Sequence, residues 1–157
     1  MIPFPRYYPL PEADESGYKY ELGENYQIEV PEMAFLPLGD IVIEKARLQI
    51  RMGTRATLYI DDGYLWDGGS SIAIDDQSMM AASLPHDVFY DMLNRLVVPE
   101  QHRERFRKEA DKVLRRVLKN FKHLSPWYFR LLPRSQWVYR GVRWGHGIWS
   151  RLFPPSK

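Results

Sequence analysis

Four side chains that could perform acid–base chemistry lie on two predicted helices. His86 and Tyr90 are four residues apart on the first helix, so they share one of its faces. Asp111 lies on the edge of the buried stripe of the second helix. A carboxylate in such a position is costly unless it is hydrogen-bonded or paired. The spacing therefore predicts a contact between His86 and Asp111, with Tyr90 close by.

This contact would have a chemical consequence. A carboxylate on one imidazole nitrogen fixes the tautomer and makes the other nitrogen a better general base. The fourth side chain, Asp87, diverges from its neighbour His86 by about 100 degrees around a helix. We therefore expect the two not to pair and Asp87 to serve a different partner.

The expected partner of Asp87 is a hard cation such as Ca²⁺. Carboxylate and carbonyl oxygens are the ligands that this ion prefers, and the loop Trp66-Asp67-Gly68-Gly69-Ser70 is the candidate to supply them. Water activated by His86 beside such a cation predicts a hydrolase without a nucleophilic side chain. The alternative stays open that a buried His-Asp-Tyr network only joins the two helices.

The elements that must position these residues begin with a small antiparallel sheet. Residues 18–30 read as strand, turn and strand, and further β-like runs follow at 41–43, 46–51 and 56–60. Turn sequences containing Gly separate these runs. Four alternating apolar residues should face the helices: Leu48, Ile50, Leu58 and Ile60.

Three helices are expected after the sheet. The first opens at the capping sequence 75–78 and runs to about Leu96, with Pro85 predicted to kink it just before His86. The second covers 100–121, with a basic face opposite its apolar stripe. The third begins near Ser135 in a tryptophan-rich segment. The fold class is therefore α+β, with one domain at 18–157 divided into a sheet part (18–63) and a loop-plus-helix part (64–157).

Residues 1–17 contain four prolines interspersed with aromatic residues. Proline fixes φ and lacks a backbone donor, so this segment should be an extended arm without regular structure. Two arrangements are compatible with the aromatic content. The arm could be a strap along its own domain, or it could dock on another subunit or partner.

Composition excludes several classes of function. The chain has no cysteine, which rules out disulfides, thiolate catalysis and cysteine zinc sites. No apolar run is long enough to span a bilayer, and the N-terminus does not resemble a signal peptide. A formal net charge of +2 does not by itself predict a polyanionic partner. We expect no specific nucleic acid, while the basic C-terminal third leaves a phospholipid membrane surface as a candidate partner.

Four short motifs follow one another along the chain: W-D-G-x-S at residues 66–70, H-D-x-x-Y at 86–90, E-A-D at 109–111 and V-R-W-G at 142–145. Together they resemble the pattern of an uncharacterised phage and prophage family. This is domain-of-unknown-function family thirteen-fifty-three, and the resemblance covers roughly residues 18–147. It implies a phage-encoded structural or accessory protein, associated with the virion in its tail, neck or capsid region. The protein would occur in the virion or host cytoplasm and contact other phage proteins or copies of itself through the arm and the tryptophan-rich C-terminus.

The same residues resemble, more distantly, the phospholipase A2 superfamily. That resemblance implies a catalytic His86 supported by Asp111 and Tyr90. It assigns a calcium ion to Asp87 together with the loop residues Asp67, Gly68 and Gly69. The implied activity is ester hydrolysis in membrane lipid during phage entry or lysis.

Overall fold

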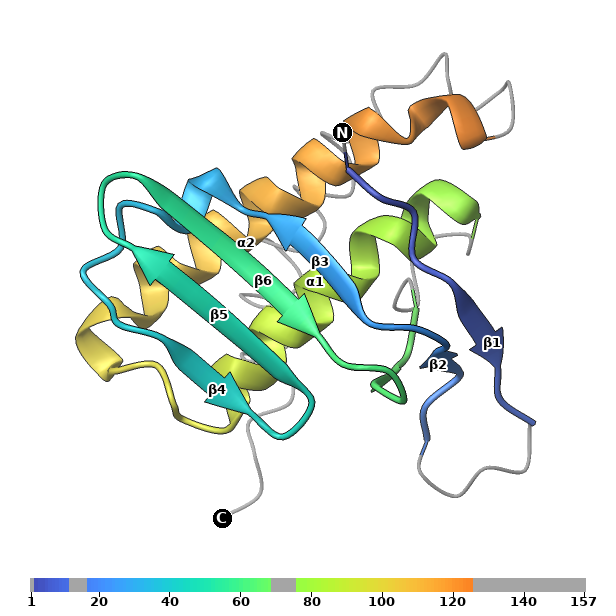
Figure 1. Cartoon of the computed structure of the whole chain (residues 1–157), viewed down its shortest axis with the longest axis horizontal. Coiled ribbons are helices and arrows are strands. Elements are labelled where there is room, and N and C mark those ends of the chain that lie inside the picture. Colours follow the sequence, from blue (N-terminus) through green and yellow to red (C-terminus); the bar gives the residue numbers. More distant parts are fainter. Residues whose placement is uncertain (1, 12–16, 69–75, 126–157) are drawn as a thin grey trace, which may run out of the picture.

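The computed structural model describes residues 2–11, 17–68 and 76–125. Two antiparallel sheets lie on one side of the molecule, and two helices pack against them (Figure 1). The expected α+β class is therefore confirmed. The third predicted helix and the tryptophan-rich segment lie outside the described residues.

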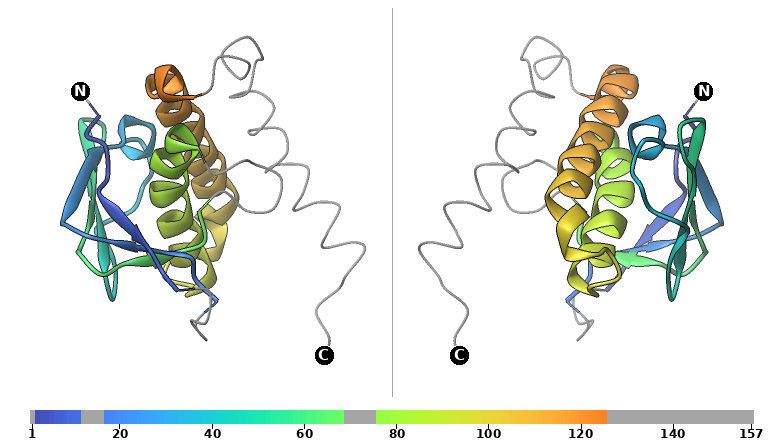
Figure 2. Two further views of the ribbon diagram at one scale, coloured as in Figure 1. Left: turned by 90° about the vertical axis from the view of Figure 1, so that its right-hand side faces the viewer. Right: turned by 90° about the vertical axis from the view of Figure 1, so that its left-hand side faces the viewer.

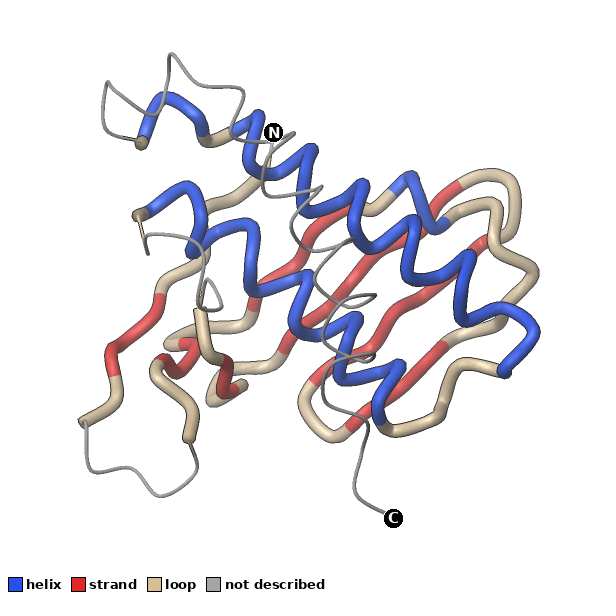
Figure 3. Tube along the Cα trace, turned by 180° about the vertical axis from the view of Figure 1, so that it is seen from behind, coloured by secondary structure: helices blue, strands red, loops and turns tan. Residues whose placement is uncertain are grey.

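The larger sheet has the strand order β3-β6-β5-β4. Its strands are β3 (Tyr26–Glu29), β4 (Ile41–Ile43), β5 (Ala46–Arg51) and β6 (Arg55–Ile60). Side chains of β3, β4 and β5 alternate between more and less buried positions, while in β6 Thr57 is buried as well as its neighbours. The helices cover one face of the sheet (Figures 2 and 3). All four residues predicted to face the helices are buried: Leu48, Ile50, Leu58 and Ile60.

The smaller sheet has the order β1-β2-β7. The prediction of a single sheet is therefore wrong. It consists of β1 (Tyr7–Pro9), β2 (Tyr20–Leu22) and β7 (Leu65–Trp66). The run 18–30 does form two strands, but β2 and β3 belong to different sheets. The turn between them does not close a hairpin, because β2 pairs with β1 and β7 whereas β3 pairs with β6. In this turn the Asn25 side chain accepts a hydrogen bond from the Asp62 N–H at 3.0 Å.

Helices α1 (Gln77–Asn94) and α2 (Glu100–Asn120) agree closely with the predicted ranges. Asp76 caps α1 by accepting a 2.9 Å hydrogen bond from the N–H of Met79, and the helix continues through Pro85. Short 3-10 turns occupy Pro31–Met33 (η1) and Lys122–Leu124 (η2). Among the described helices, none is long and apolar enough to cross a membrane.

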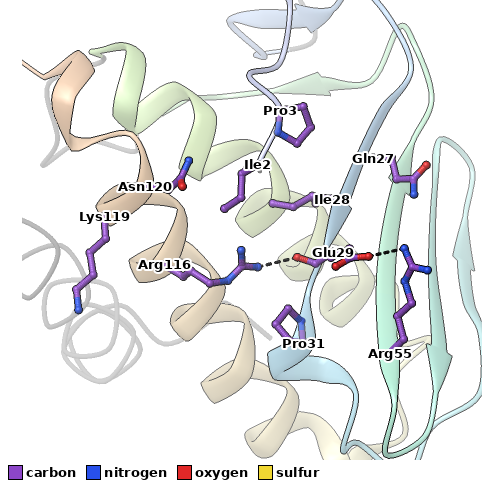
Figure 4. Close-up of a pocket in the computed structure, with 10 residues that line it drawn as sticks. All are labelled: Ile2, Pro3, Gln27, Ile28, Glu29, Pro31, Arg55, Arg116, Lys119 and Asn120. Carbon is purple, nitrogen blue, oxygen red and sulfur yellow. Dashed lines mark hydrogen bonds and ion pairs between the residues drawn. The ribbon is translucent and has the colours of Figure 1, made fainter.

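Arg116 ties α2 to the edge of the larger sheet. Its Nε lies 2.6 Å from Oε1 of Glu32, and one terminal nitrogen donates to the carbonyl of Glu29 at 2.8 Å. The side chain of Glu29 in turn pairs with Arg55 on β6 (Figure 4). These two ion pairs and the hydrogen bond between them run from helix to sheet beside the first residues of the chain.

The N-terminal arm is a strap on its own domain. The Tyr7 ring lies edge-on to Tyr20 and Trp66, with centroids 5.6 and 5.8 Å apart. Phe4 meets Phe121 at the end of α2, with centroids 5.5 Å apart. The strap prediction is confirmed, but the expected lack of regular structure is wrong, because residues 7–9 pair with β2 as β1.

Replacing Tyr7 by Ala should lower the free energy of unfolding by about 1–3 kcal/mol, because its ring contacts with Phe4, Tyr20 and Trp66 are all lost. Tyr8 is the matched control, since it lies on the other face of the same strand and is 61% exposed. Tyr8→Ala should change stability by less than about 0.5 kcal/mol. Chemical denaturation of both variants measures the difference, and equal losses would contradict the packing of the strap.

Candidate functional site

The carboxylate of Asp111 lies at the centre of the site. Its side chain is 0% exposed, and its Oδ1 is 3.3 Å from Nε2 of His86. The hydroxyl of Tyr90 donates to the same Oδ1 at 3.1 Å. The predicted contact is therefore present, while a catalytic role for these residues stays a prediction.

The two helices bring these groups together because they are joined by a short connection. Residues 95–99 turn the chain from α1 into α2, with Leu96 in the left-handed region at φ 61°. His86 and Tyr90 are one turn apart on the α1 face, and their rings pack with centroids 4.3 Å apart. The imidazole is thus held by a ring on one side and a carboxylate at its edge.

The expectation that His86 and Asp87 do not pair is wrong. Nδ1 of His86 lies 3.7 Å from Oδ1 of Asp87, which is within ion-pair distance but longer than a normal hydrogen bond. Nδ1 is bonded to the ring carbon nearest the helix backbone. When Nε2 is directed at Asp111, Nδ1 therefore remains within reach of the Asp87 side chain, although the Cα–Cβ bonds of the two residues diverge. His86 therefore lies between two carboxylates.

The two carboxylates decide the protonation of His86. Burial opposes a charged imidazolium and by itself would lower the pKa of His86. The interactions with Asp111 and Asp87 outweigh this effect, so the pKa of His86 is raised above its ordinary value. Burial also raises the pKa of Asp87, partly opposed by His86 and increased by the charge of Asp67.

The loop that carries Asp67 is fixed from two directions. The indole N–H of Trp66 donates to the hydroxyl of Ser83 on α1 at 3.3 Å. Gly68 has φ +75°, and a Cβ there would lie 2.7 Å from Cε2 of Tyr20. Glycine is therefore required by both conformation and space. As a result Asp67 lies near Asp87, where its N–H and its charge both act on the pKa of that carboxyl.

The donor types around Asp87 fit a calcium ion in part. Asp87 and Asp67 offer hard carboxylate oxygens, and backbone carbonyls of the loop would complete the set together with water. Within the described residues, no three His, Asp or Glu side chains are grouped closely enough to hold a metal by themselves. Asp87, Asp67 and Gly68 are the residues that would hold the ion, and Gly69 lies outside the described residues.

Tyr64 belongs to this region, although its role was not predicted. Its ring is buried, and burial raises its pKa, with the charges of Asp91 and Asp87 adding to the effect. Tyr64 is therefore close enough to Asp91 and Asp87 for their charges to act on its hydroxyl. Nothing in the sequence distinguishes it from the other nine of the ten tyrosines.

Comparison with known proteins found no family model, no curated protein and no solved structure that matches this chain. The resemblances to the phage family and to the phospholipase A2 superfamily therefore stay predictions. The function has to be argued from the geometry of the site.

Asp111→Asn should lower the pKa of His86, because the amide keeps the shape of the side chain but removes its charge. Because the pKa of His86 is higher in the folded than in the unfolded state, protonation of His86 stabilises the fold. This stabilisation is complete below the pKa of the unfolded state, about 6.5, and is lost as pH rises through the pKa of the folded state. Above pH 6.5 the free energy of unfolding should therefore decrease less with rising pH in Asp111→Asn than in the wild type. NMR titration of the imidazole and denaturation at several pH values measure both effects.

Asp91→Asn is the matched control, because Asp91 lies on α1 and pairs with the exposed Arg95 at 2.9 Å. This variant should leave the His86 titration unchanged. Equal shifts in both variants would show that general charge, rather than the direct contact, sets the pKa of His86.

Proposed function

We propose that the protein is a hydrolase in which His86 activates water to cleave an ester. One observation carries this proposal: a single oxygen of the fully buried Asp111 contacts both His86 Nε2 and the Tyr90 hydroxyl. A carboxylate in this position holds the proton of the neutral ring on Nε2. Nδ1 is then the basic nitrogen, on the side of Asp87 and Asp67.

The proposed reaction needs no nucleophilic side chain. Nδ1 takes a proton from water as the water oxygen forms a bond to the ester carbonyl carbon. The imidazolium that results is stabilised by Asp111 and Asp87. It then returns the proton to the alcohol oxygen as the carbon–oxygen bond breaks, and a carboxylic acid and an alcohol are released.

The proposed substrate is a membrane lipid ester, cleaved during phage entry or lysis. This part of the proposal is supported by the resemblance to the phospholipase A2 superfamily, in which the residues of the H-D-x-x-Y pattern occupy the same positions as His86, Asp87 and Tyr90. A calcium ion held by Asp87, Asp67 and Gly68 would polarise the ester carbonyl and stabilise the developing oxyanion.

His86→Gln should lower the rate of phospholipid hydrolysis at least about 100-fold, because the general base is lost. His102→Gln is the control, since His102 lies at the start of α2 with its ring beside Gln101, away from the described site. Release of fatty acid from vesicles measures the rate, and far-ultraviolet circular dichroism establishes that each variant is folded. Undiminished hydrolysis by folded His86→Gln would refute the proposal.

Calcium should raise the melting temperature, because a ligand that binds only the native state stabilises it by about 2.7 kcal/mol at 100 times its Kd. Asp87→Asn should abolish the increase, whereas Asp91→Asn should keep it. Thermal melting with calcium and with a chelator measures the effect. An equal increase in wild type and Asp87→Asn would place the ion elsewhere.

A second candidate is a virion-associated structural or accessory protein. It is favoured by the position of His86, whose side chain is only 12% exposed and has a carboxylate near each ring nitrogen. In this role the network cross-links α1 and α2. The exposed face of the strap, which carries Tyr8, and the C-terminal segment would contact other phage proteins or further copies. His86→Gln would then cost stability, by roughly 3–5 kcal/mol for a broken buried pair, and wild type would release no fatty acid.

A further inference from the structure

One end of the molecule combines exposed apolar side chains with arginines. Phe35 and Met52 are 64% and 70% exposed, and Arg51, Arg55 and Arg105 are exposed near them. We call these five residues the apolar–basic tip. They come from the loop after η1, from the β5–β6 hairpin and from the first turns of α2. The right-hand view of Figure 2 looks at the molecule from this end.

Backbone hydrogen bonds fix the tip. The N–H of Gly53 donates to the carbonyl of Ala34 at 2.7 Å, which joins the hairpin to the loop. Arg105 donates to the carbonyl of Phe35 at 3.1 Å, which joins the loop to α2. Both apolar side chains are therefore presented from braced backbone, so little backbone conformational entropy would be lost when they bind.

The arrangement of charge at the tip favours an anion. Arg51 and Arg55 are direct partners across the β5–β6 ladder, and like charges in that position are destabilising. Glu29 pairs with Arg55, while Arg105 adds a third positive charge close by. The other end of the same sheet is more acidic: Glu44, Asp61 and Asp62 lie in its turns, together with one base, Lys45. The sheet is thus basic at the end where Phe35 and Met52 are exposed.

Two more exposed apolar residues lie outside the apolar–basic tip. Leu96 and Val97 occupy the connection between α1 and α2 (Figure 1). Leu96 has φ 61°, a left-handed conformation that costs a side-chain-bearing residue about 1–2 kcal/mol. A leucine that is both exposed and in this conformation contributes little to the core.

We propose that the apolar–basic tip binds the surface of an anionic lipid bilayer. Phe35 and Met52 would enter the boundary between headgroups and acyl chains, and the three arginines would contact lipid phosphates. A nucleic acid fits less well, because the tip offers a single aromatic ring, Phe35, rather than a series of aromatic faces on which successive bases could stack. The proposal concerns attachment alone and does not depend on hydrolysis at His86.

The absence of cysteine in the chain permits a direct test. In Met52→Cys an environment-sensitive fluorophore can be attached at position 52 alone. Val42→Cys, labelled in the same way, is the control, because Val42 is also exposed, at 60%, but lies on the edge strand β4. Vesicles of phosphatidylglycerol and phosphatidylcholine should increase emission at position 52 and not at 42. Equal changes at both positions, or no change at 52, would overturn the proposal.

A second measurement quantifies the contribution of the tip in the full chain. Phe35→Ser/Met52→Ser and Arg51→Glu should each weaken co-sedimentation with these vesicles at least about tenfold, given the loss of apolar burial or the reversal of one charge. Val42→Ser should bind like wild type, and vesicles of phosphatidylcholine alone should bind weakly. Unchanged binding by the tip variants, or tip-dependent dimers in sedimentation without lipid, would refute attachment through this surface.

Discussion

The buried carboxylate of Asp111 is the constraint on which the arrangement of the helices depends. A charge with no exposure is tolerated only if donors reach it, and α1 supplies two of them, His86 and Tyr90, one helical turn apart. This requirement sets how α1 lies along α2. A slip of one residue along either helix would separate the donors from the acceptor and leave the charge uncompensated. The apolar contacts between the helices, such as Phe89 with Phe106, are compatible with that register but are less selective.

The sheets serve the same site from the other side. The larger sheet gives α1 and α2 an apolar surface, while the smaller sheet ends at Trp66, immediately before Asp67. Because Trp66 is held by the strap and by Ser83, the carboxylate that follows is placed near Asp87. His86 is therefore the meeting point of two structural units, with Asp111 fixed by helix packing and Asp87 influenced by the loop. Its two ring nitrogens report on different parts of the molecule.

Part of this arrangement could be predicted from the sequence. An acidic residue at the edge of an apolar helical stripe, here Asp111, needs a hydrogen-bonding partner. His86, four positions before Tyr90, was the suitable residue. Capping residues and periodicity likewise predicted α1 and α2 well. Two features were not accessible. The separation of β2 from β3 depends on pairings with distant strands and on the Asn25 side chain, and the approach of His86 to Asp87 depends on side-chain rotamers. Neither leaves a periodic signal.

The pairing of the strap has a mechanical consequence. Antiparallel strands that are pulled apart from one end separate one residue pair at a time, and β1 pairs with β2 over only three residues. A force applied at the N-terminus would first load the contact of Phe4 with Phe121 at the end of α2 and would then detach β1. The Tyr7 ring would then leave Trp66, and the tether of the Asp67 loop would depend on β2 and Ser83 alone. Tension on the first ten residues would thus reach the carboxylates around His86 without unfolding the core.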